Sequence, residues 1–263
     1  MGTTIKFALG VMVLLFILPV RADIAPRVVD IPSRPGVTQR LLVLAPPSPK
    51  AAVILFAGGH GGLQISADGS FGWGKGNFLI RSRQLFVDHG LLTVVIDAPS
   101  DRQSAPYLAG NRQGAEHAAD VQAVIAWVRQ LSGLPVWLVG TSRGTQSSAA
   151  VATRLSRADG PDGLVLTSTI LSDPKAPSVP AMALDRLGIP VLVAHHELDG
   201  CSHCAYGDIP NLMQKLENSP RKQLLSFRTG VSRGDPCEAM AYHGFNGIES
   251  DVVGQIAGWI LAR

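Results

Sequence analysis

The sequence predicts an α/β fold: a doubly wound, mostly parallel sheet flanked by helices. Short apolar runs alternate along the chain with segments of helical periodicity, which favours strand–helix–strand units with right-handed crossovers. The runs are continuously apolar rather than alternating, as expected of parallel strands covered on both faces. No internal repeat and no long linker divides the chain, so we expect one domain.

The first residues are expected to be removed from the mature protein. Lys6 precedes an apolar run from Phe7 to Val20, and Val20-Arg21-Ala22 resembles a small-x-small cleavage site. The run is shorter than the roughly 20 residues of a membrane span. We therefore predict a signal peptide over residues 1–22, a mature domain over 23–263 and a secreted or periplasmic location without stable membrane insertion. An uncleaved anchor is the alternative.

The mature chain opens with a proline-rich, extended segment up to about Arg40, and the strands follow it. Each predicted strand is a short run rich in Val, Ile and Leu. These runs cover residues 41–44, 52–56, 91–96, 136–139, 164–166, 191–194 and 223–227.

Helices are predicted between the runs from apolar residues at helical spacing. Val121 to Leu131 repeat in this way, and Gly133-Leu134-Pro135 ends the helix. A second helix is expected around residues 210–217 before Pro220, and an amphipathic one near the C-terminus over residues 252–260.

Two loops, residues 58–76 and 99–114, are longer than a crossover needs. Loops at the carboxyl ends of parallel strands are where ligands bind. Aromatic side chains in or beside these loops could line a pocket or be ordinary core residues: Phe71, Trp73, Phe78 and Tyr107.

Charge gives no reason to expect a nucleic acid partner. The formal net charge is +3, and removing Lys6 and Arg21 with a segment that holds no acid lowers it to +1. No basic stripe is present elsewhere.

Three cysteines, Cys201, Cys204 and Cys237, predict one disulfide with one thiol left over in an oxidising compartment. A bridge from Cys237 to Cys201 or Cys204 is preferred over Cys201–Cys204, because closing a longer loop stabilises by roughly 3–4 kcal/mol in the chain-entropy model. A zinc site using His203 and the cysteines lacks a second CxxC or His pair. We therefore expect no metal.

The most informative motif is Gly140-Thr141-Ser142-Arg143-Gly144. It follows a predicted strand and precedes a small-residue stretch, 146–152, that can be helical. Strand, G-x-S-x-G and helix together are typical of a sharp turn that projects a nucleophilic serine from the top of a sheet. The glycines let the strand and the helix approach closely.

A serine nucleophile needs a base, and the base needs an acid that orients it. His243 lies after the last predicted strand, which matches the chain order serine, acid, histidine. Asp199 follows the strand 191–194 in an Asp-Gly turn and is the predicted acid. The rival bases are His60, His89, His117, His195 and His196, and the rival acids are Glu197 and Asp208.

The developing oxyanion needs backbone donors. One is expected from the N–H of Arg143, and the other from the glycine-rich segment 57–62, with Gly59 first and His60 second. A phosphate cradle is the competing interpretation of this segment, but it lacks the expected glycine–lysine pattern.

The cysteines flank these residues, since Cys201 and Cys204 follow Asp199 and Cys237 precedes His243. We therefore hypothesise that the bridge holds Asp199 and His243 in register.

With Ser142, Asp199 and His243 in this order after a glycine-rich segment, the mature chain resembles the alpha/beta-hydrolase fold superfamily. The resemblance implies a largely eight-stranded sheet and no metal or organic cofactor. Only about residues 167–189 separate two strands where many members carry a cap, so no large cap is expected. A serine at the turn is unlike the aspartate of haloalkane dehalogenases and epoxide hydrolases.

The sequence thus predicts a serine hydrolase that cleaves a small-molecule carboxylic ester through an acyl-serine intermediate. Two alternatives stay open: a peptidase or amidase of the same fold, and a non-catalytic binding protein on this scaffold.

Overall fold

The computed structural model describes residues 1–2, 26–155 and 158–262. All but the first two residues of the predicted signal peptide lie outside this range. Within the described residues, no helix is both long enough and apolar enough to cross a bilayer.

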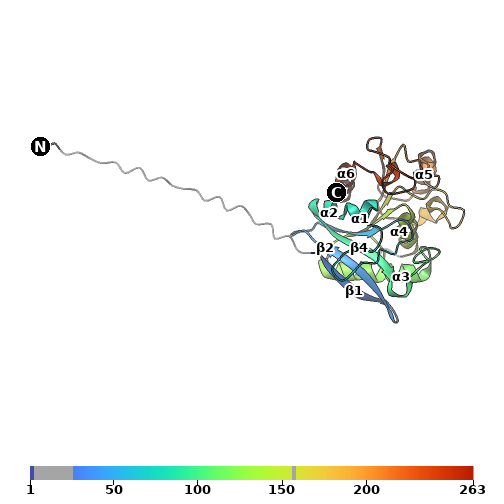
Figure 1. The fold of residues 1–263 in the computed structure, drawn as a ribbon, viewed down its shortest axis with the longest axis horizontal. Helices are drawn as coiled ribbons and strands as arrows, with labels where there is room; N and C mark the ends of the chain where they lie inside the picture. The colour runs from blue at the N-terminus through green and yellow to red at the C-terminus, as the bar shows by residue number, and fades with distance from the viewer. Residues whose placement is uncertain (3–25, 156–157, 263) are drawn as a thin grey trace.

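The centre of the molecule is an eight-stranded sheet of order β1-β2-β4-β3-β5-β6-β7-β8 (Figure 1). β1 and β2 are antiparallel to their neighbours, and every pairing from β4 to β8 is parallel. The strands are β1 (Arg27–Arg34), β2 (Val37–Leu44), β3 (Ala51–Phe56), β4 (Leu91–Pro99), β5 (Val136–Thr141), β6 (Gly163–Thr167), β7 (Val191–His196) and β8 (Lys222–Phe227). The predicted mostly parallel, doubly wound sheet is confirmed.

Each of the seven predicted runs is a strand, and one strand, β1, was missing from the prediction. The sequence predicts only an extended segment there, because prolines argue against a central strand. β1 lies at the sheet edge, where Pro32 is tolerated, and its register with β2 shifts between Pro32 and Arg34.

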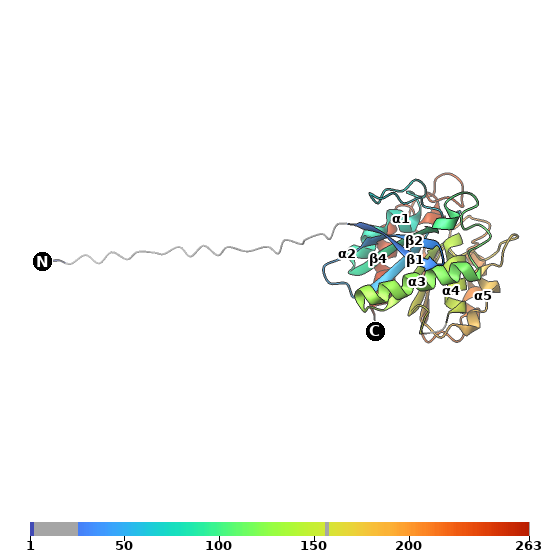
Figure 2. The same cartoon turned by 90° about the horizontal axis from the view of Figure 1, so that it is seen from below.

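Helices cover both faces of the sheet. The named α-helices are α1 (Phe78–Arg81), α2 (Arg83–Asp88), α3 (Ala115–Ser132), α4 (Arg143–Arg154), α5 (Ile209–Lys215) and α6 (Glu249–Leu261). Figure 2 shows α3 and α4 in front of the sheet, with α1 and α2 beyond it.

Among the described residues, most buried apolar side chains form two cores, one on each face, and a small third cluster holds Ile170, Cys201 and Cys204. Ile54 of β3 packs in the core that contains α3, α4 and α5, whereas its neighbour Leu55 packs in the core that contains α1, α2 and α6. Successive residues of a strand point to opposite faces, so a strand between two cores must be apolar throughout. This explains the continuous runs in the sequence.

Residues at or just after the carboxyl ends of β3, β5 and β7 line one cavity. Between β6 and β7 the chain forms only two short 3₁₀ turns, Val179–Ala181 and Leu184–Arg186, so there is no large cap. The loops at this edge of the sheet therefore define the candidate site.

Candidate active site

Ser142 lies at the turn between β5 and α4, with φ 52° and ψ −127°. This backbone conformation is rare for a residue with a side chain and marks strain. A Cβ at position 140 would lie 2.6 Å from the carbonyl oxygen of Gly144. A Cβ at position 144 would collide with the carbonyl oxygen of Phe56. Both glycines are therefore required for the close passage of strand and helix around the serine.

Hydrogen bonds on each side hold the strained turn. The Ser142 amide donates to the carbonyl of Thr167 at 3.1 Å. Thr145 donates to the Ser142 carbonyl through its amide, at 2.8 Å, and through its hydroxyl, at 2.6 Å. The Ile170 amide donates in turn to that hydroxyl at 3.2 Å. The sequence did not single out Thr145, because its role depends on the strands that meet around it.

Asp199 and His243 are brought together, although they are 44 residues apart in the chain. Nδ1 of His243 lies 2.9 Å from Oδ2 of Asp199, and their side chains are 5% and 0% exposed. The other carboxylate oxygen accepts from the Cys201 amide at 2.9 Å. Ser168, which the sequence also did not single out, donates its hydroxyl to the His243 carbonyl at 2.6 Å.

This contact identifies which ring nitrogen of a neutral His243 carries the proton. An ionised carboxylate can only accept, so Nδ1 carries the proton and Nε2 is the acceptor nitrogen of the neutral ring. Nε2 of His243 is buried and has no hydrogen-bond partner within the described residues.

The rival residues have other partners. Nε2 of His195 lies 2.8 Å from the Cys204 carbonyl and 3.6 Å from the Asp199 carboxylate. Burial lowers the pKa of His195, although the Asp199 charge opposes this shift. His196 contacts the Thr229 carbonyl at 2.8 Å, and Glu197 pairs with Arg228.

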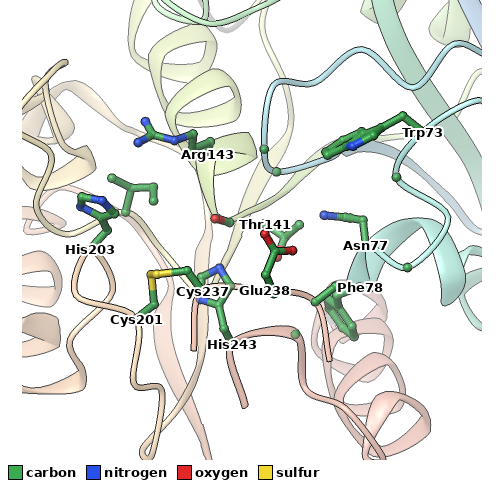
Figure 3. A pocket seen from close by; sticks show the side chains of 18 residues that line it. Trp73, Asn77, Phe78, Thr141, Arg143, Cys201, His203, Cys237, Glu238 and His243 are labelled. Carbon is green, nitrogen blue, oxygen red and sulfur yellow. A yellow bond between two sulfur atoms is a disulfide. The ribbon is translucent and has the colours of Figure 1, made fainter. Parts of the chain in front are cut away.

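Ser142 and His243 line the same cavity, which has a volume of about 310 Å³. No hydrogen bond joins them in the described structure, as is common before a substrate tightens such a site. Figure 3 shows Trp73 and Asn77 on one side of this cavity and His203 with a disulfide on the other.

Of the four aromatic side chains considered from the sequence, Trp73 and Phe78 line the cavity. Phe71 packs in the core instead, and Tyr107 stacks on His60 with ring centroids 4.3 Å apart. Burial is the largest cause that lowers the pKa of His60.

The glycine-rich segment runs directly beside the serine. A Cβ at position 58 would lie 3.0 Å from the Ser142 Cβ. Gly59 has φ +55°, and a side chain there would collide with the Trp73 ring. In the described part of the chain, the amides of Gly59 and Arg143 have no hydrogen-bond acceptor. Both residues line the cavity and leave donors for a ligand oxygen.

The Arg143 side chain has a separate, structural partner. It forms an ion pair with Asp173 at 2.7 Å, and Gln146 donates to the same oxygen at 3.0 Å. Burial acts to raise the pKa of Asp173, but hydrogen bonds from Lys175, Arg143 and Gln146 lower it overall.

The predicted long-range bridge is confirmed, and it joins Cys201 to Cys237. Cys204 is the leftover thiol; it is buried, and burial raises its pKa. The sulfur atoms of Cys201 and Cys204 and a nitrogen of His243 lie within 4.8 Å of one another. Because Cys201 and Cys237 are bonded to each other, neither can offer a thiolate to the zinc site weighed from the sequence.

Asp97, near the end of β4, is a buried carboxylate that orders the loop after the glycine-rich segment 57–62. It accepts from the amides of Leu63, Gln64, Ile65 and Ala98 at 2.6, 3.2, 2.8 and 2.7 Å. An acid at the end of an apolar strand was the available signal, but its partners come from another segment.

No protein-family model matches the sequence, and no curated protein is significantly similar to it. Solved structures do resemble the fold. An esterase from Pyrococcus furiosus is 13% identical with a TM-score of 0.62, covering 90% of this chain and 91% of that one. A dienelactone hydrolase from Anabaena variabilis is 15% identical with a TM-score of 0.60, covering 90% and 97%.

A third similar structure is an alpha/beta serine hydrolase without lid from Xanthomonas campestris, 16% identical, with a TM-score of 0.55, covering 89% of this chain and 95% of that one. At such identities the similarity establishes the fold. The order of the sheet, the turn at Ser142 and these neighbours agree that this chain has the alpha/beta-hydrolase fold.

Proposed function

We propose that residues 23–263 form a secreted or periplasmic serine hydrolase that cleaves carboxylic esters of small molecules. In this proposal Ser142 is the nucleophile, His243 the general base and acid, and Asp199 the residue that orients His243. The amides of Gly59 and Arg143 stabilise the oxyanion.

The buried contact between His243 Nδ1 and Asp199 Oδ2, 2.9 Å long, carries the proposal. It leaves Nε2 of the imidazole as the free acceptor in the wall of the cavity that Ser142 also lines. A buried carboxylate stabilises the imidazolium that forms when the serine loses its proton.

The chemistry follows from these positions. The Ser142 hydroxyl oxygen bonds to the ester carbonyl carbon while its proton passes to Nε2 of His243. The tetrahedral oxyanion accepts hydrogen bonds from the two amides. When the carbon–oxygen bond to the alcohol breaks, His243 returns the proton to that alcohol. Water, activated in the same way, then releases the acid from the acyl-serine.

Two observations favour an ester over a peptide substrate. No large cap or added domain covers the serine, so nothing in the described chain selects an extended peptide. Two of the similar structures are an esterase and a dienelactone hydrolase. Export is supported by the Cys201–Cys237 bridge, because disulfides persist in oxidising compartments.

The test is labelling by a fluorophosphonate together with hydrolysis of p-nitrophenyl esters of graded acyl length and their amide analogues. We expect wild type to be labelled and to cleave esters. Ser142→Ala should lose the label and at least about 10³-fold in kcat, because the triad acts as a unit.

The matched control for this experiment is Ser202→Ala, which changes an exposed serine of the loop after Asp199. It should keep both activities. Cleavage of amides alone would favour the peptidase or amidase alternative. Absence of both label and turnover in a folded wild type would favour a non-catalytic binding protein.

A further inference from the structure

Arg112 is a buried cation that the mechanism above does not use. It lies before α3, and only 6% of the residue is exposed. Within the described residues it has no carboxylate partner: Nη1 donates to the Ser147 hydroxyl at 2.8 Å, and Nη2 to backbone carbonyls. Burying a charge without a counter-ion destabilises a fold unless hydrogen bonds compensate for the lost hydration. The hydrogen bonds of Arg112 therefore indicate what the side chain does.

The carbonyls belong to the glycine-rich segment. Nη2 lies 3.2, 3.3 and 3.1 Å from the carbonyl oxygens of Ala57, Gly58 and Gly59. Three successive peptide groups thus turn their oxygen atoms toward one guanidinium.

The opposite side of these peptides faces away from the arginine. The only cis peptide bond in the described chain is Ala105–Pro106, so the peptides after residues 57, 58 and 59 are trans. In a trans peptide the N–H points opposite to the C=O. The N–H of Gly59 therefore points away from Arg112, and Gly59 lines the Ser142 cavity.

The glycines themselves do not hold the peptide between residues 58 and 59 in this orientation. A Gly-Gly pair rotates its shared peptide with little steric resistance. If that peptide rotated by half a turn, a carbonyl would replace the N–H donor beside Ser142.

The backbone around the Arg112 guanidinium also leaves room for it. Gly61 has φ +80°, and a Cβ there would lie 2.6 Å from Nη2 of Arg112. Burial, and secondarily the charge of Arg143, lower the pKa of Arg112 to about 9. The surroundings thus disfavour the charge, which leaves the three carbonyls and Ser147 as its compensation.

We propose that Arg112 is a positioning residue for the oxyanion site: it binds the carbonyls of residues 57–59 and so fixes the Gly59 N–H toward the cavity. This inference rests on the proposed hydrolase function. Arg112 acts through the backbone and does not touch the substrate.

The first test compares kcat and KM for the best-cleaved p-nitrophenyl ester, and the affinity for a trifluoromethyl ketone with the same acyl chain, in Arg112→Met and Arg112→Lys. We expect kcat and ketone affinity of Arg112→Met to fall together by about 10²-fold or more, as on loss of one oxyanion donor, while KM changes less than about threefold. Arg112→Lys should recover part of both, because an ammonium still donates to carbonyls.

The matched control is Arg129→Met. Arg129 also donates to backbone carbonyls, those of Ala158 and Gly160, and pairs with Asp162, but it lies in the last turn of α3, at the opposite end of that helix from Arg112. It should keep wild-type kcat and ketone affinity. A kcat of Arg112→Met equal to that of Arg129→Met, or a fall in kcat with unchanged ketone affinity, would overturn the proposal.

Two further measurements separate this idea from folding defects and from the proposed function. Ser147→Ala removes only one acceptor of Arg112, and we expect a several-fold fall in kcat with native circular dichroism. A crystal structure of Arg112→Met should show the 58–59 peptide rotated, even if wild type hydrolyses nothing. An unrotated peptide would refute the role of Arg112 whatever the fate of the hydrolase proposal.

Discussion

Ser142 has a strained backbone conformation at the centre of the candidate site. Its positive φ is disfavoured for a residue with a side chain by roughly 1–3 kcal/mol, and the surrounding bonds from Thr145 and to Thr167 maintain it. Each residue around it has one task. Gly140 and Gly144 provide room, and Asp199 fixes the ring of His243.

Asp199→Asn tests the role of the acid directly. An amide can donate to Nδ1 and would place the imidazole proton on Nε2, the wrong nitrogen for a base. We expect kcat to fall by about 10³- to 10⁴-fold with little change in KM or in unfolding free energy. Steady-state kinetics measures kcat and KM, and urea denaturation measures the unfolding free energy. Asp208→Asn, at an exposed position, is the control and should behave as wild type.

At the scale of elements, the site is assembled from loops that follow different strands. The loop after β7 supplies Asp199, and the segment between β8 and α6 supplies His243. The Cys201–Cys237 bridge joins these two segments, and the Cys201 amide also donates to the Asp199 carboxylate. One covalent link therefore acts on both members of the Asp199–His243 pair.

Removing the Cys201–Cys237 bridge should therefore lower the hydrolysis rate under conditions in which the protein is still folded. The sequence separation of 36 residues corresponds to a stabilisation of about 4 kcal/mol in the chain-entropy model. For Cys237→Ser, with Cys204→Ala as the control that keeps the bridge, we expect esterase activity of the first variant to fall at least tenfold at 25 °C. Native tryptophan fluorescence should persist. Parallel loss of activity and fluorescence would contradict the registering role.

At the scale of the whole molecule, two cores enclose the sheet and bury titratable groups with it. His117 of α3 is 1% exposed, contacts Phe56 edge-on, and neither ring nitrogen has a partner within the described residues. Burial, followed by the charge of Arg112, lowers the pKa of His117 to about 3.

This burial makes the fold sensitive to acid. The folded state keeps His117 neutral, whereas the unfolded chain takes up a proton below about pH 6.5. The unfolded state then binds more protons, so the unfolding free energy falls as the pH drops from about 6.5 toward 3. Each pH unit in that window costs up to about 1.4 kcal/mol for this one group.

His117→Leu should flatten this acid limb. Urea denaturation at several pH values between 7 and 4 measures the slope, and His89→Leu, at an exposed histidine, is the matched control. We expect the control to follow wild type and His117→Leu to lose less stability per pH unit. Equal slopes for all three proteins would show that His117 does not set the acid limb.

Much of the fold could be predicted because its signals are local. A strand between two cores must be apolar throughout, which is why seven runs were visible in the sequence. β1 was not recognised as a strand, because Pro32 is acceptable only at a sheet edge and the sequence does not reveal which strand lies there. The turn at Ser142 is also local, since glycines two positions to each side determine it.

By itself, the sequence determined the α/β class, the glycine-flanked turn at Ser142 and the chain order of Ser142, Asp199 and His243. Only the tertiary structure decided that Cys201 rather than Cys204 bonds to Cys237, that Asp199 rather than Glu197 contacts His243, and that Arg112 holds the glycine-rich segment. The sequence could not decide these contacts because each one joins residues that are far apart along the chain. Propensity and periodicity act over a few residues, whereas these contacts depend on how distant loops meet at one edge of the sheet.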